Sequence, residues 1–135
     1  MINPVDILTA LHRAWGKVEG VPLFLFVPRD TVPPYGVMQM DTLHPGNGLP
    51  YPLFYTEGQA RLDVWSAYEG THRLGELLTT LQQKAPKNYI PCSMGYLWVK
   101  TLQPEIKTQL PDGRHQWRQG TLSISFSYSS QKEES

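Results

Sequence analysis

Residues 120 to 128 alternate between two kinds of side chain, and this alternation constrains the fold more than any other feature of the chain. Leu122, Ile124, Phe126 and Tyr128 occupy every second position, and hydroxyl residues fill the positions between them. Because successive side chains of a β-strand point to opposite faces, the pattern predicts a half-buried strand, apolar towards a core and polar on its other side. We therefore expect a sheet with one covered face.

Two segments with the period of an amphipathic helix can cover such a sheet. The first, residues 3 to 15, begins with Asn3 as a capping residue and Pro4 at the first helical position. Its apolar face consists of Val5, Leu8, Leu11 and Trp15. The second, residues 71 to 83, is marked by Leu74, Leu77, Leu78 and Leu81. Pro86 is expected to stop this second helix, because proline cannot continue the hydrogen-bond pattern.

Further strands are expected at residues 35 to 41, 59 to 66 and 93 to 102, and residues 21 to 28 are expected to form a short buried strand or an extended wall between two prolines. The order is then α-β-β-loop-β-α-β-β, which predicts a single α+β domain over residues 1–135, with a mostly antiparallel sheet and two helices packed on one face. The proline- and glycine-rich segment 42–58 is expected to be a flexible loop, of a length at which loops are usually functional. His44, Asn47 and Tyr51 in this loop are candidate partner contacts, and residues 129–135 are expected to be a short polar tail.

The composition is that of a folded domain without an excess of either charge. Hydrophobic residues make up 40% of the 135 residues, and 12 basic residues balance 12 acidic ones. Nucleic-acid binders usually carry a basic patch for phosphates, and no stretch of this chain concentrates basic residues, so no nucleic-acid specificity is expected. The longest apolar run, 21–27, is too short to span a membrane, and the first residues lack a signal-peptide pattern. We therefore expect a protein assembled in the cytoplasm.

No motif for catalysis, cofactor binding or metal binding stands out. The four histidines, at positions 12, 44, 72 and 115, have no histidine or cysteine at metal-ligand spacing. Cys92 is the single cysteine, its surroundings match no nucleophile motif, and we interpret it as a small buried hydrophobe. The sequence is therefore not expected to encode an enzyme, a metal site or a cofactor site.

Aromatic residues outside the expected core are the strongest candidates for function. Trp65 falls on the strand face opposite Leu62, and Tyr68 follows the same strand. Trp98 lies on a strand that is apolar on both of its faces, which indicates either cover by helices on both sides or contact with a partner. Aromatic residues beyond the needs of one core are typical of protein interfaces. We interpret Trp65, Tyr68 and Trp98 as candidate contacts between subunits or with partners.

Residues 60 to 84 resemble a segment of the tail terminator, or tail completion, proteins of long-tailed phages and phage-like gene transfer agents. The resemblance rests on residues 60–70, which read ARLDVWSAYEG, and on the leucine-periodic helix that follows. In that family a strand of the form hydrophobic-Asp-Val-Trp-Ser leads through a short turn into the second helix. The other elements agree in order: a first helix, a strand entry with Val-Pro and Pro-Pro-Tyr-Gly-Val at 27 to 37, and a closing strand behind an arginine-containing approach at 114–120.

The resemblance implies a tail-terminator-like fold and a structural role in the virion, at the head-proximal end of the tail. Such proteins form a ring, commonly a hexamer, that stops growth of the tail tube and receives the head connector. The implied partners are copies of the chain itself, the major tail tube protein and the head–tail connector protein. Two alternatives stay open: another head–tail connector or minor tail protein, and a small-ligand binding domain or enzyme that uses the loop at 42–58 as a lid.

Overall fold

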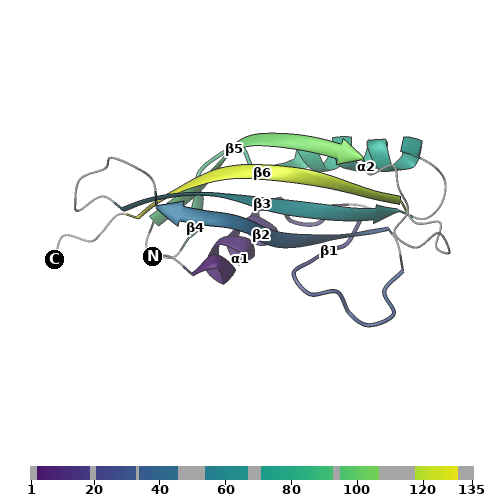
Figure 1. Ribbon diagram of the computed structural model, residues 1–135, viewed down its shortest axis with the longest axis horizontal. Helices are drawn as coiled ribbons and strands as arrows, with labels where there is room; N and C mark the ends of the chain where they lie inside the picture. Colours follow the sequence, from purple (N-terminus) through teal and green to yellow (C-terminus); the bar gives the residue numbers. More distant parts are fainter. Residues whose placement is uncertain are drawn as a thin grey trace.

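The chain has an α+β fold in which two helices lie against a mixed, curled sheet. The computed structural model describes residues 3–18, 21–32, 34–45, 54–66, 71–92, 95–106 and 118–130. These residues form, in order, α1 (Pro4–Trp15), β1 (Leu23–Phe24), β2 (Tyr35–Pro45), β3 (Phe54–Ser66), α2 (Thr71–Lys84), β4 (Ile90–Cys92), β5 (Gly95–Ile106) and β6 (Arg118–Ser130). The sheet has the strand order β1-β2-β3-β6-β5-β4 (Figure 1). β1 pairs with β2 in parallel, and each of the other neighbouring pairs is antiparallel.

Both helices begin and end close to the residues that the sequence indicated. The side chain of Asn3 accepts a hydrogen bond of 2.8 Å from the backbone N–H of Val5, so it caps α1. Gly16 follows the helix with a φ of 70°, a backbone conformation that glycine adopts without strain. α2 spans Thr71–Lys84, one residue longer than predicted, and ends before Pro86.

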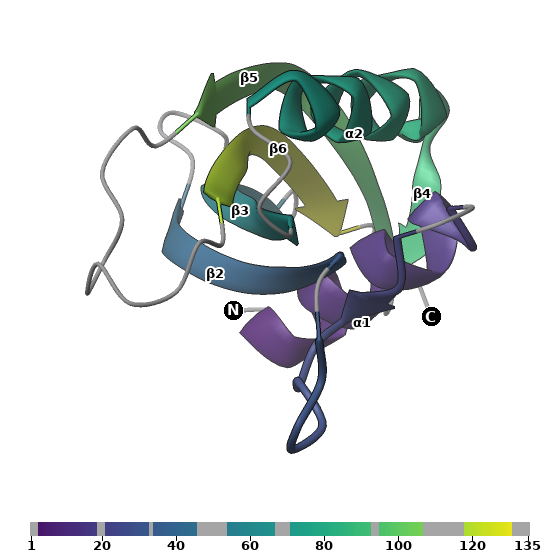
Figure 2. The same ribbon diagram turned by 90° about the vertical axis from the view of Figure 1, so that its right-hand side faces the viewer.

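The core lies between the helices and one face of the sheet, which we call the inner face (Figure 2). The predicted alternation of β6 is confirmed: Leu122, Ile124 and Phe126 are fully buried. The other largest contributors are Ile7 and Leu11 from α1, Leu74 and Leu81 from α2, Met38 from β2, Leu62 and Val64 from β3, and Leu97 from β5. The opposite face, which we call the outer face, carries the polar residues of the same strands.

The strands beside the expected loop are longer than predicted. β2 continues to Pro45 and β3 begins at Phe54, so residues 42–45 and 54–58 of that loop are strand, and 46–53 lie outside the described residues. The extension includes Gly58, the last residue of the segment that was expected to be a loop. Its place in the strand has a packing reason, because a Cβ there would come within 2.6 Å of both the ring of Phe126 and the carbonyl oxygen of Thr42.

Other boundaries also differ from the prediction, and β5 runs to Ile106 where the sequence predicted an end at 102. Residues 21 to 28, expected as a short strand or an extended wall, contain only the two-residue β1, because the flanking prolines have no N–H to donate to a ladder. Ser129 and Ser130 of the expected tail belong to β6, while 131–135 lie outside the described residues. β4 was not predicted. Within the described part of the chain, no helix is long and apolar enough to cross a membrane.

Candidate functional site

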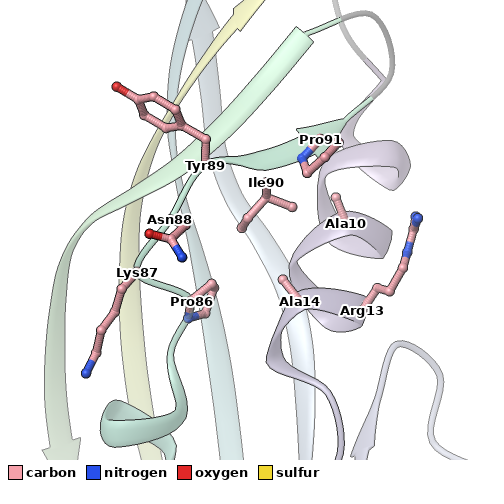
Figure 3. Close-up of a pocket in the computed structure, with 9 residues that line it drawn as sticks. All are labelled: Ala10, Arg13, Ala14, Pro86, Lys87, Asn88, Tyr89, Ile90 and Pro91. Atoms are coloured by element: carbon pink, nitrogen blue, oxygen red, sulfur yellow. The ribbon is translucent and has the colours of Figure 1, made fainter.

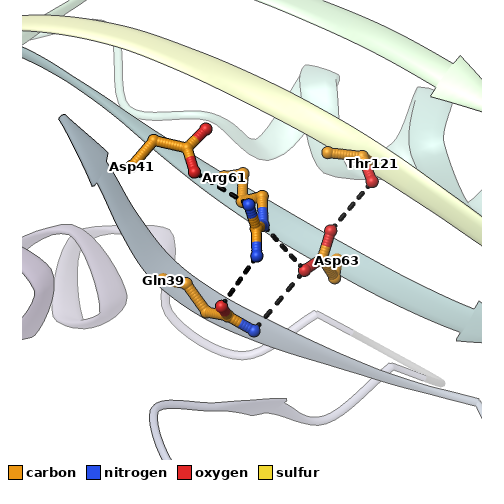
Figure 4. A network of polar contacts seen from close by, with 5 residues as sticks. All are labelled: Gln39, Asp41, Arg61, Asp63 and Thr121. Carbon is orange, nitrogen blue, oxygen red and sulfur yellow. Dashed lines mark hydrogen bonds and ion pairs between the residues drawn. The ribbon is translucent and has the colours of Figure 1, made fainter.

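The outer face of the sheet carries a polar network across β2, β3 and β6 (Figure 4). Arg61 is at its centre: its Nη1 lies 2.8 Å from Oδ1 of Asp41, its Nε lies 3.0 Å from Oδ2 of Asp63, and its Nη2 donates to Oε1 of Gln39 over 3.0 Å. Thr121 Oγ1 donates a 2.8 Å hydrogen bond to the other carboxylate oxygen of Asp63. The network therefore ties three neighbouring strands together through side chains alone.

Asp63 is the buried member of this network, with an exposed fraction of 6%. A buried carboxylate is costly unless hydrogen bonds and an opposite charge compensate it, and here both oxygens of Asp63 accept hydrogen bonds. The hydrogen bond and the negative charge of Asp63 raise the pKa of Arg61, so the guanidinium stays protonated. These groups compensate one another, and we assign the network a structural role: it holds the register of the outer face.

Trp65 lies at one end of the outer face, next to two other aromatic residues. It is half-buried and stands opposite Tyr35 of β2 and Gln119 of β6. The ring of Tyr35 is 6.3 Å from that of Phe24 in an edge-to-face arrangement, and burial raises the pKa of Tyr35. The strand face predicted for Trp65 is confirmed, because Leu62 and Val64 point to the core.

Trp98 and His44 lie at the opposite end of the outer face. They share one row across the sheet, in which His44 pairs with Glu57, Glu57 with Ser127, and Ser127 with Trp98. Three strand spacings separate the two ends of this row, about 14 Å. His44 is exposed and belongs to β2, whereas the sequence placed it in a loop. Lys100, at the register shift of β5 next to this row, has its Nζ 3.0 Å from Oε1 of Glu57.

A second group of aromatic residues surrounds Trp98. The ring of Tyr89 lies 5.4 Å from that of Trp98 and 6.3 Å from that of Tyr96. Tyr89 is 68% exposed and Tyr96 is 45% exposed, so this cluster presents aromatic surface to its surroundings. Aromatic side chains of this kind supply much of the contact area in protein interfaces.

The candidate residues named from the sequence thus fall into two separate groups. Glu57, in the row of Trp98 and His44, lies eight positions before Trp65 on β3, which corresponds to about 26 Å at the rise of an extended strand. A single small contact cannot engage both groups. Tyr68, Asn47 and Tyr51 lie outside the described residues.

Concave surfaces lie along α1, and the sequence reading did not identify them. One, with a volume of about 490 Å³, lies between α1 and the segment before β4 and is lined by Ala10, Ala14, Tyr89 and Ile90 among others (Figure 3). A groove of about 1060 Å³ lies on another side of the helix, with Val18, Val21 and Leu23 as its apolar part and Arg13 and Lys17 as its basic part. Arg13 lines both.

Among the described residues, the groove beside α1 has His12 as its one metal-ligating side chain, and the surface next to β4 has no histidine, cysteine or carboxylate. Cys92 is buried, its thiol lies 3.6 Å from the carbonyl oxygen of Asp6, and burial, followed by the charge of Asp6, raises the pKa of this thiol. A thiol with a raised pKa is a poor nucleophile. His12 Nε2 lies 2.7 Å from the carbonyl oxygen of Leu23 and joins α1 to β1. Among the described residues, no group of three or more His, Cys, Asp or Glu side chains could hold a metal ion.

Comparisons with known proteins add no family to this description. No protein-family model matches the chain, and a search of curated proteins gives no match either.

Proposed function

We propose that the protein is a structural component of a phage-type tail, a terminator or completion protein that forms a ring with copies of itself and caps the tail tube. The sequence resemblance over residues 60 to 84 supports this role. The observation that carries the proposal is the surface: aromatic residues at both ends of the outer face, with Tyr89 and Tyr96 substantially exposed. A subunit of a ring needs one surface for each neighbour and further surface for the tube and the connector.

The separation of the two aromatic groups supports a subunit with more than one contact. Tyr89, Tyr96 and Trp98 form one cluster, and Trp65 stands beside Tyr35 at the far end of the sheet. The network around Arg61, on β2, β3 and β6, lies between them and includes the strand that carries Trp65. A rigid sheet that holds two distant contact sites at a constant spacing suits a ring, in which each interface must repeat without error.

The proposal predicts oligomers of one discrete size and a measurable effect on tube growth. Light scattering coupled to size-exclusion chromatography, first on the chain alone and then with tail-tube protein, tests it directly. We expect a closed oligomer and tubes whose growth stops when the protein is added. A strict monomer that never binds tube ends would contradict the proposal. Binding to an isolated head connector or to a minor tail protein, without tube capping, would favour the neighbouring structural roles.

A small-ligand binding role is the second candidate, and the groove beside α1 is the observation that favours it. Its volume of about 1060 Å³ and its apolar lining resemble those of ligand sites. A thermal-shift screen with small apolar carboxylates tests this role. A rise in melting temperature that Arg13→Glu abolishes would support it, and the absence of any rise across the screen would count against it.

A further inference from the structure

The segment that connects β1 to β2 forms a projecting arm, which we define as residues 25–32. The arm extends away from the body of the molecule in both ribbon views, where it is the dark-blue excursion between the two strands (Figures 1 and 2). Phe26 is 91% exposed and Val32 is 72% exposed, and Val27 is exposed as well. Three exposed apolar side chains on eight residues form the kind of patch that marks a protein contact.

The arm is held in shape by hydrogen bonds at its base and at its turn. At the base, the N–H of Gly36 donates to the carbonyl oxygen of Pro22 over 2.9 Å. At the turn, the N–H and the hydroxyl of Thr31 both donate to the carbonyl oxygen of Pro28, over 3.2 Å and 2.6 Å. Asp30 adopts a φ of 65° within this turn. A preorganised arm loses little conformational entropy when it binds.

The groove beside α1 has the complementary chemistry. Leu23, Pro22 and Pro34 supply accessible apolar surface above the buried Val18 and Val21. The basic side chains of Arg13 and Lys17 lie beside them. The groove is lined by no residue of the arm of the same chain, although the arm begins only two residues after Leu23. Apolar surface and positive charge are thus available to a segment from outside.

We propose that the arm of one copy of this chain occupies the groove of the next copy, with Phe26 on the apolar floor and the carboxylate of Asp30 facing Arg13 and Lys17. The inference rests on the proposed self-assembly and names the surfaces that mediate it. The side chains of Asp30 and Arg13 are both exposed, and neither side chain forms a hydrogen bond or an ion pair with another described residue, so each has capacity for a partner. Arm and groove are different surfaces of one chain, so the contact is head-to-tail, the type that closes into rings.

Charge reversal tests the pairing of Asp30 with Arg13. We expect Asp30→Arg and Arg13→Glu each to weaken self-association, measured by analytical ultracentrifugation, by about tenfold or more, because each places like charges opposite each other. The chain that carries both substitutions should recover most of the loss, since the pair is then restored with its signs exchanged. If the double variant is weaker than either single variant, this pairing is wrong.

Mixing two defective chains tests the head-to-tail geometry. Phe26→Asp removes the arm's anchor and Arg13→Glu weakens the groove, so each variant alone should remain monomeric at a concentration at which the wild type assembles and a tenfold weaker contact does not. An equimolar mixture keeps one intact arm and one intact groove, and we expect it to form heterodimers and nothing larger. Wild-type assembly by either variant alone would overturn the proposal.

Two valines test whether assembly depends on the arm itself or on exposed apolar side chains in general. Val32 on the arm and Val5 on α1 are exposed to similar degrees, 72% and 61%, and Val5 does not line the groove. Val32→Ser should weaken assembly and Val5→Ser should leave it unchanged. Equal effects of the two substitutions would contradict a role for the arm.

The outcome for the arm is distinguishable from the outcome for the proposed function. The association assays use the chain alone and no tube protein. If the ring depends on Phe26 but never caps tubes, the contact between arm and groove is supported and the tail role is contradicted. If the Phe26→Asp variant still caps tubes as well as the wild type, the contact between arm and groove is contradicted and the tail role is not. If the wild-type chain stays monomeric, the proposed contact between arm and groove is wrong.

Discussion

The indole Nε1 of Trp15 donates a hydrogen bond of 3.0 Å to the backbone carbonyl oxygen of Leu81. Trp15 is the last residue of α1, and Leu81 lies in the last turn of α2, where carbonyl groups lack a partner within the helix. Both residues are buried, at 3% and 0% exposure, so water does not replace the missing partner. The bond therefore fixes the two helices to each other at the point where both pack on the sheet.

Trp15→Phe is expected to lower the free energy of unfolding by about 1 to 3 kcal/mol, because it leaves a buried carbonyl without a donor. Phenylalanine keeps an aromatic ring at the position, so most of the apolar contact is retained. Urea unfolding followed by far-UV circular dichroism measures the change. A variant as stable as the wild type would show that the hydrogen bond contributes nothing net.

Asp63→Asn should destabilise the protein by about 2 kcal/mol, since it removes the buried charge that compensates Arg61 and hydrogen-bonds Thr121. Asp41→Asn is the matched control, because Asp41 pairs with the same guanidinium but is itself exposed. Exposed ion pairs contribute little, and the control is expected to stay within about 0.5 kcal/mol of the wild type. Equal losses in the two variants would argue against burial as the cause.

Gly58→Ala and Gly75→Ala are expected to change stability in opposite directions. A Cβ at Gly58 would meet the Phe126 ring and the backbone oxygen of Thr42, both at 2.6 Å, and a backbone atom cannot move aside cheaply. We expect a loss of about 1 to 3 kcal/mol. A Cβ at Gly75, in α2, meets nothing within 4 Å, so alanine should stabilise the helix by about 0.5 to 1 kcal/mol. Thermal unfolding of the two variants measures both the expected loss and the expected gain of stability.

Elements with a strong local pattern could be predicted from the sequence. The alternation around Ile124 and the spacing of Leu74 and Leu81 each specify one buried face, and the structure buries those residues completely. The capped start of α1 at Asn3 could be predicted for the same reason, because the interaction is local.

Features that depend on tertiary contact could not be predicted. Gly58 reads as a turn residue until Phe126 is known to lie against it. The network around Arg61 depends on the register of β2 against β3, which places Gln39 opposite Arg61. Likewise, no local signal marks the groove beside α1, because it forms only where the segment that contains Val21 lies against the helix.

The thiol of Cys92 is expected to make stability fall at alkaline pH. Burial raises the pKa of Cys92 in the folded chain, whereas the unfolded thiol titrates near its usual pKa of about 8.5. Above that pH the unfolded chain loses a proton that the folded chain retains, so the free energy of unfolding decreases as the pH rises through the folded pKa. Below it both states hold the proton, and the contribution does not change.

Denaturant unfolding of the wild type and of Cys92→Ala, at several pH values from 7 to 10, isolates this contribution. The wild type should lose more stability than the variant over the upper half of that range. Tyr35, whose pKa burial also raises, remains in both proteins and gives them a common alkaline loss. Identical slopes in the two proteins would mean that Cys92 titrates alike in the folded and unfolded chains.

Trp65→Ala is expected to weaken assembly more than it weakens folding, because Trp65 is half-buried on the outer face while its neighbours on β3 point to the core. Leu62→Ala on the inner face is the comparison. Leu62 is fully buried, and its truncation should cost about 2 to 5 kcal/mol by leaving a cavity. Trp65→Ala should cost clearly less in urea unfolding and yet shift the oligomer towards monomer in light scattering. If it instead costs as much as Leu62→Ala while assembly persists, Trp65 supports the fold and the interface lies elsewhere.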